Sequence, residues 1–108
     1  MTSGDAADWN LTIGNLRNLL AGFPPGSAEL ELVAYGPGLA FLKKESSSAP
    51  AVTVLLAKHV RFVACENTMR VQQVSASALI QGVETVPSGV VEVVTKQEQG
   101  WSYIKAGR

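Results

Sequence analysis

The sequence predicts a single α/β domain in which a mostly parallel sheet lies between layers of helices. Its 108 residues are enough for one compact domain with one core. Runs typical of strands alternate along the chain with runs typical of helices, as in layered α/β folds. The run "VRFVAC" at residues 60–65 is short, apolar and rich in branched or aromatic side chains. Such a run indicates a strand covered on both faces, which implies a parallel sheet with helices on each side.

The first predicted element is an amphipathic helix over residues 8–22, "DWNLTIGNLRNLLAG". Asp8 is placed to cap the start of this helix, and Gly22 is placed to end it. The apolar residues that recur at helical spacing are Trp9, Ile13, Leu16 and Leu20. The opposite side carries polar side chains, which is typical of a surface facing solvent.

The next predicted elements lead up to the apolar strand at residues 60–65. Residues 28–35, "AELELVAY", alternate apolar and charged residues and then become wholly apolar, as expected of a strand that enters a core. Pro37 suits the first turn of a helix, so residues 37–44 are predicted as a short helix. A further helix is predicted at residues 51–58, "AVTVLLAK".

The chain after Cys65 is predicted to turn at once into a helix. Residues 66–72, "ENTMRVQ", are expected to form this helix with Asn67 or Thr68 as its cap. Residues 75–82, "SASALIQG", are expected to form another short helix that closes at a glycine.

The last third of the chain is predicted to add a strand, a helix and an extended end. Residues 83–87, "VETVP", indicate a brief strand. The valines of residues 88–100 would suit a strand, but Ser88 as a cap, the polar end of the segment and the spacing of its valines favour a helix. The valines at that spacing are Val90, Val91 and Val94. Residues 101–107, "WSYIKAG", are expected to be extended and to pack through their apolar side chains.

Charge and hydropathy exclude several classes of function. Nine basic and nine acidic side chains cancel and form no run of one sign, so no nucleic acid is expected as a partner. No apolar stretch approaches the roughly 20 residues needed to cross a bilayer, so no membrane association is expected. The start, "MTSGDAAD", has neither a basic end nor an apolar segment for secretion, and we expect a cytoplasmic protein.

The chain has one cysteine, Cys65, and one histidine, His59. A single cysteine forms no internal disulfide, so the thiol is free unless another chain or a small molecule caps it. The two residues are too few soft ligands for a metal site, and no cofactor is expected. His59 precedes the strand that ends at Cys65, so it should lie at the opposite end of that strand and have a structural role.

Cys65 is the candidate for chemistry because of its place in the predicted fold. Reactive groups in parallel sheets gather beyond the carboxyl ends of the strands, where loops lead into helices. A thiol at such a helix start is stabilised as the thiolate, so we expect Cys65 to be partly exposed and acidic. Asn67 and Thr68 are candidates to donate hydrogen bonds to the sulfur. A role in packing remains the alternative for a cysteine that ends an apolar strand.

The turn "GPG" at residues 36–38 follows the neighbouring predicted strand. Gly36 and Gly38 would allow a ligand to approach the backbone closely, and a plain turn is the alternative. These two glycines, with Asn67 and Thr68, are the candidate ligand-binding residues around Cys65.

Several phrases, among them "VAYGPGLAFL", "VRFVACENTMR" and "GWSYIKAG", resemble the DsrE/DsrF-like family over about Trp9 to Gly107. This resemblance implies a flavodoxin-like three-layer sandwich over residues 9–108. We expect residues 1–8 to form a flexible N-terminal segment. It also implies homo-oligomers, often trimers or hexamers. In sulfur-relay members of the family a cysteine carries a persulfide, and Cys65 is the residue that matches.

One departure from the family concerns the start of the sheet. Family members usually begin with an apolar strand before the helix that "WNLTIGNLRNLL" matches, whereas only "MTSGDAAD" precedes it here. Either the start of the chain is truncated or mis-assigned, or the sheet has one strand fewer. If the strand is absent, one edge of the sheet is left open, and a neighbouring subunit would cover it.

Two functions of different classes follow from these observations. In the first, Cys65 takes up sulfur as a persulfide from a donor and passes it to the thiol of a partner, since the chain has no second cysteine to resolve the persulfide. In the second, the protein is a non-catalytic oligomeric module that binds a small ligand or nucleotide in the crevice beyond the strand ends, and Cys65 merely lines it.

Overall fold

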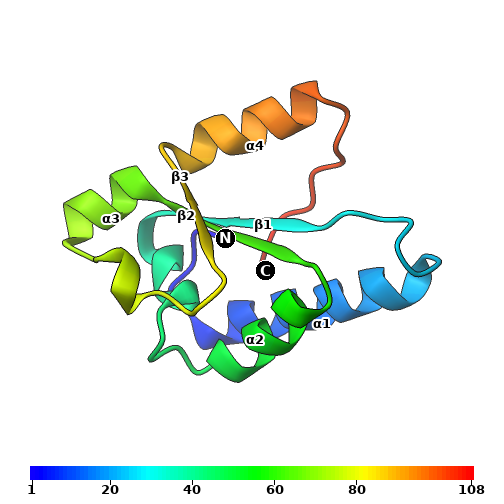
Figure 1. The fold of residues 1–108 in the computed structure, drawn as a ribbon, viewed down its shortest axis with the longest axis horizontal. Coiled ribbons are helices and arrows are strands. Elements are labelled where there is room, and N and C mark those ends of the chain that lie inside the picture. The colour runs from blue at the N-terminus through cyan, green and yellow to red at the C-terminus, as the bar shows by residue number, and fades with distance from the viewer.

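The computed structural model describes residues 1–108, in which helices and strands alternate along the chain (Figure 1). Elements named η are 3₁₀-helices. In chain order the elements are α1 (Ala6–Gly22), β1 (Glu31–Ala34), η1 (Gly36–Leu42), α2 (Ala49–Ala57), β2 (Arg61–Cys65), α3 (Glu66–Gln72), η2 (Ala76–Ala78), β3 (Glu84–Val86) and α4 (Gly89–Glu98).

The sheet has three parallel strands in the order β1, β2, β3. The register pairs Ala34 of β1 with Ala64 of β2, and Cys65 of β2 with Val86 of β3. Helices α1 and α2 lie below the sheet and α4 lies above it in the view of Figure 1. The predicted α/β class, with a parallel sheet in a flavodoxin-like sandwich, is confirmed.

The main core lies between the sheet and the helices α1 and α2. Strand residues alternate between the two faces of the sheet, and Leu32 and Phe62 point into this core. The ring centroid of Phe41, from η1, lies 6.3 Å from that of Phe62 and 5.8 Å from that of Trp9 in α1. These aromatic contacts tie the first helix to the middle of the sheet.

The opposite face of the sheet is covered by α4, which packs against β1 and β2. The predicted helix and its cap are confirmed, since the Ser88 side chain accepts a hydrogen bond from the N–H of Val91. However, the valines whose spacing indicated the helix point outward, with exposed fractions of 54% for Val90, 59% for Val91 and 50% for Val94. Gly89 is the only residue of α4 that is fully buried.

Three local predictions about caps and short helices were wrong. The cap of α1 is Asp5, whose side chain accepts a hydrogen bond from the N–H of Ala7, and Asp8 lies within the first turn. Neither Asn67 nor Thr68 caps α3, because the strand runs directly into the helix and Cys65 occupies the cap position. Residues 75–82 contain only the single 3₁₀ turn η2.

The two ends of the chain lie beside the core. Met1 is buried, and α1 begins at Ala6, within the segment 1–8 that the sequence analysis set apart. At the other end, residues 101–105 have no regular secondary structure, as expected of an extended segment. The Arg108 side chain binds Asp8 at 2.7 Å and Asp5 at 2.6 Å, which fastens this end to the start of α1.

Candidate functional site

Cys65 lies at the carboxyl end of the middle strand, where β2 passes into α3 without a loop. Its backbone is extended, with φ −78° and ψ 118°, and the next residue is already helical. Only 4% of the residue is exposed. The expected position is therefore observed, but the expectation of a partly exposed thiol was wrong, because the starts of α3 and α4 both reach the sulfur.

The surroundings of Cys65 favour the thiolate. Burial alone would raise the pKa of Cys65, but the nearby backbone N–H groups of Thr68, Gly89 and Asn67 and the Thr68 side chain, which favour the thiolate, outweigh it. The pKa of Cys65 is therefore lowered from its ordinary value. The donors come from two different elements, α3 and α4, which face one another across the end of β2.

Thr68 connects Cys65 to the turn after β1. The Thr68 hydroxyl oxygen accepts a hydrogen bond of 2.9 Å from the N–H of Gly36. This leaves the hydroxyl proton free to be donated to the sulfur of Cys65. Gly36 has φ 58°, a conformation that glycine adopts without strain, and its carbonyl accepts a hydrogen bond of 3.0 Å from Nε2 of Gln72. Gly36 and Thr68 thus form one hydrogen-bonded unit beside the thiol.

The other two candidate residues are placed differently. The backbone N–H of Asn67 lies near Cys65 but donates a hydrogen bond of 3.3 Å to the carbonyl of Pro87. The side-chain oxygen of Asn67 accepts a hydrogen bond from Arg70. Gly38 lies against the start of the chain, where an added Cβ would be 2.1 Å from the carbonyl oxygen of Met1. The close approach that was expected at this glycine is therefore made to the chain's own first residues.

Gly89 is a residue of this site that the sequence analysis missed. A Cβ at Gly89 would lie 2.9 Å from Cδ1 of Tyr35, so only glycine lets the start of α4 pack against this ring. That packing brings the N–H of Gly89 to the sulfur of Cys65. Ser88 marked the start of a helix in the sequence, but no local pattern shows that this start lies beside Cys65.

His59 and Glu66 do not form a catalytic group with the thiol. His59 follows α2 in the left-handed conformation, with φ 68°, and precedes β2, so it lies at the other end of the strand, as expected. The carboxylate of Glu66 accepts a hydrogen bond of 2.7 Å from the hydroxyl of Thr85 in β3. The structure thus provides hydrogen-bond donors around Cys65 and shows no general base in contact with it.

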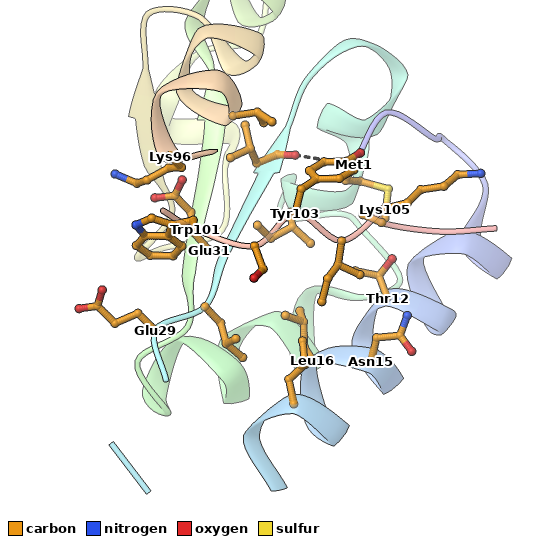
Figure 2. Close-up of a pocket in the computed structure, with 18 of the residues that line it drawn as sticks. Met1, Thr12, Asn15, Leu16, Glu29, Glu31, Lys96, Trp101, Tyr103 and Lys105 are labelled. Atoms are coloured by element: carbon orange, nitrogen blue, oxygen red, sulfur yellow. Dashed lines mark hydrogen bonds between the residues drawn. The ribbon is translucent and has the colours of Figure 1, made fainter. Parts of the chain in front are cut away.

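A separate groove lies along the free edge of β1, away from Cys65 (Figure 2). Its walls are α1, residues 29–33, the end of α4 and the extended segment 101–106. Glu31 and Trp101 both line it, and Lys96 lies with its ammonium 5.5 Å from the centroid of the Trp101 ring. This groove contains none of the residues predicted to bind a ligand.

No group of three or more His, Cys, Asp or Glu side chains is placed to hold a metal ion. None of the helices is long and apolar enough to span a membrane.

Comparisons with known proteins agree with this geometry. The profile of the DsrE/DsrF-like family matches residues 3–106. No curated protein matches the chain. Among solved structures, the protein of unknown function MTH1491 from Methanobacterium thermoautotrophicum is similar, with a TM-score of 0.88 and 39% sequence identity over 93% of this chain and 88% of that chain. The chain therefore belongs to the DsrE/DsrF-like family.

Proposed function

We propose that this protein is a sulfur carrier in which Cys65 holds sulfur as a persulfide and passes it to the thiol of a partner. Membership of the DsrE/DsrF-like family suggests a role related to sulfur relay. The observation that carries the proposal is the set of hydrogen-bond donors around Cys65, which lowers the pKa of a buried thiol that would otherwise have a raised one.

The proposed transfer occurs in two displacement steps without net oxidation or reduction. The Cys65 thiolate attacks the terminal sulfur of a donor persulfide, R–S–SH, so that a new S–S bond forms and the old S–S bond breaks. The donor leaves as the thiolate R–S⁻, and Cys65 carries the persulfide. An acceptor thiolate then attacks the terminal sulfur of this persulfide, and the Cys65 thiolate is the leaving group.

The donors around Cys65 support both steps. They stabilise the thiolate that attacks in the first step and leaves in the second. Because the thiol is almost completely buried, the donor and acceptor sulfur atoms must be presented by small molecules or by protruding side chains. The single cysteine also prevents the persulfide from collapsing into a disulfide within the chain.

The test is to incubate the protein with glutathione persulfide and measure its mass by intact-protein mass spectrometry. We expect the mass of one added sulfur atom, lost again when a thiol acceptor is supplied. The variant Cys65→Ser should remain unmodified. Failure of the unaltered protein to take up sulfur would favour a module that binds a ligand without sulfur chemistry.

We also propose that copies of the chain associate, as trimers or multiples of three, through the outward-facing valines of α4. Three half-exposed valines on one helix form an apolar surface that a partner would remove from water. Since Gly89 at the start of α4 lies beside Cys65, a neighbouring subunit on this surface would lie near the thiol. Light scattering tests this: a mass of 11.4 kDa, that of one chain, would contradict the proposal. Val91→Lys should lower the mass if this helix is the contact.

A further inference from the structure

Two residues flank Cys65 in the sheet, one on each neighbouring strand. On β3 the register pairs Cys65 with Val86. On β1 the register pairs Ala34 with Ala64, the residue before Cys65. The backbone of Tyr35 is extended, with φ −150° and ψ 169°, so it continues this register by one residue. Tyr35 therefore lies opposite Cys65, at the strand spacing of about 4.8 Å.

The side chains of Tyr35 and Cys65 point to the same face of the sheet. Ala34 and Ala64 belong to the main core, and side chains alternate along a strand, so the next residue of each strand faces α4. The first residue of α4 is in contact with both. A Cβ on Gly89 would lie 2.9 Å from Cδ1 of Tyr35, and the N–H of Gly89 lies beside the sulfur of Cys65.

The other groups around the sulfur are held in place. The hydroxyl of Thr68 accepts a hydrogen bond of 2.9 Å from the N–H of Gly36, and the group above the sulfur is the backbone of Gly89. Val86 is short and branched at Cβ, so its side chain is stiff. The Tyr35 ring is the larger of the two flanking side chains and is only half-buried. It is therefore the group whose movement can open a way to the thiol.

The direction in which the Tyr35 ring can move limits the width of this opening. The ring already packs against Gly89, so movement toward α4 is blocked and only movement toward solvent remains. A narrow molecule needs a small displacement of the ring. A broad molecule needs the ring to leave its contact with Gly89, which costs the packing between them.

We propose that Tyr35 determines the specificity of the site, because its ring admits to Cys65 only molecules that are narrow near the reacting atom. The sulfur donors that meet this condition are persulfides on an unbranched chain, whereas aromatic and branched persulfides are excluded. The identity of the donors rests on the proposed function. The steric barrier itself applies to any reagent that meets the Cys65 thiolate.

The test compares the alkylation of Cys65 by iodoacetamide, which is narrow, and by monobromobimane, which has two fused rings. Both reagents are uncharged and react with the thiolate, so the ratio of their rate constants does not depend on the pKa of Cys65. We expect the ratio of the bimane rate to the iodoacetamide rate to be lower in the protein than in glutathione. Tyr35→Ala should raise this ratio about tenfold, since the broad reagent no longer displaces a ring.

Matched variants separate the ring from other effects of the mutation. Tyr35→Phe keeps the ring and should leave the ratio unaltered. Tyr103→Ala removes a tyrosine that is 60% exposed in the C-terminal segment and should also leave it unaltered. The bimane rate of Tyr35→Ala should be constant in urea below the unfolding transition, because the reagent enters the folded protein.

Three results would overturn the proposal. They are an unchanged ratio in Tyr35→Ala, an equal increase in Tyr35→Phe, and a bimane rate of Tyr35→Ala that rises with urea below the transition. The last would assign the reaction to detachment of α4. No readout uses a persulfide, so a protein that takes up no sulfur but gives the expected ratios would contradict the proposed function alone.

Discussion

The two faces of the sheet differ in how completely they are covered. Toward α1 and α2, side chains such as Phe41 and Phe62 are completely buried in a core of 17 residues. Toward α4, the covering helix contributes one fully buried residue, Gly89, and turns its valines outward. The difference indicates that the first face supplies most of the hydrophobic stabilisation of the fold. The second face contains the backbone N–H of Gly89, which favours the thiolate of Cys65, and the valine surface proposed for self-association.

The mutation expected to lower the free energy of unfolding most lies on the face of the sheet that α1 and α2 cover. Phe62→Ala should lower the free energy of unfolding by about 3–5 kcal/mol, because it leaves a cavity among residues without solvent contact. Val94→Ala, on the outer side of α4, should change it by less than about 0.5 kcal/mol in the monomer. Urea unfolding at low protein concentration measures both. Equal losses of unfolding free energy in the two variants would show that the two faces contribute equally to stability.

Gly89→Ala tests whether the start of α4 is as tightly packed as its buried position indicates. The new methyl group would collide with the Tyr35 ring, so we expect a loss of about 1–3 kcal/mol in urea unfolding. The displacement should also raise the pKa of Cys65, since the N–H of Gly89 would move away from the sulfur.

Gly14→Ala is the matched control, because no atom lies within 4 Å of the added Cβ in α1. This change should stabilise the protein by roughly 0.5–1 kcal/mol, the usual gain when alanine replaces glycine inside a helix. If Gly14→Ala lowered the stability as much as Gly89→Ala, the collision with the Tyr35 ring would not explain the loss at Gly89.

Thr68→Val should raise the pKa of Cys65, because it removes the side-chain hydrogen bond to the thiolate. It also leaves the N–H of Gly36 without its acceptor, at a cost of about 1–3 kcal/mol. The rate of iodoacetamide labelling against pH measures the pKa. Thr53→Val changes a threonine on the exposed side of α2 and should leave the profile unaltered.

The same pKa shift predicts the dependence of stability on pH. The pKa of Cys65 is lowered in the folded state, so the stabilisation by the thiolate is fully present above the unfolded value of about 8.5. It is lost as the pH falls through the lower, folded value. The stability of the protein relative to Cys65→Ser should therefore rise with pH between these two values, and a difference that is constant with pH would contradict the lowered pKa.

Trp101→Ala should have a small effect on the free energy of unfolding. The sequence analysis expected residues 101–107 to pack through their apolar side chains, and burial of this ring in the core would make the loss about 3–5 kcal/mol. In the structure the ring is half-buried at the groove, outside the core, with Lys96 above it. We therefore expect a loss of about 0.5–1 kcal/mol, typical of an exposed cation–π contact, in thermal or urea unfolding. A loss as large as that of Phe62→Ala would show that the groove belongs to the core.

The elements that were predicted well are those whose signals are local. The helix α1 shows its apolar spacing, β2 is a short run of branched and aromatic residues, and Ser88 stands at the start of α4. The cap of α1 was predicted at Asp8 and is Asp5, because the cap depends on where the first backbone hydrogen bonds of the helix form, which apolar spacing does not show. The outward direction of the α4 valines could not be predicted, since helical spacing shows that residues share a face but not what that face contacts.

The sequence by itself determined the α/β class, the order of most elements and the place of Cys65 at the end of a strand, because these depend on periodicity and on neighbours along the chain. Only the tertiary structure decided what surrounds the thiol. Gly89 is 24 residues from Cys65 in the numbering of the chain, and Gly36 contacts Thr68 across 32 residues. Contacts of this kind arise when β1, β2 and α4 come together at one end of the sheet, so no local pattern records them.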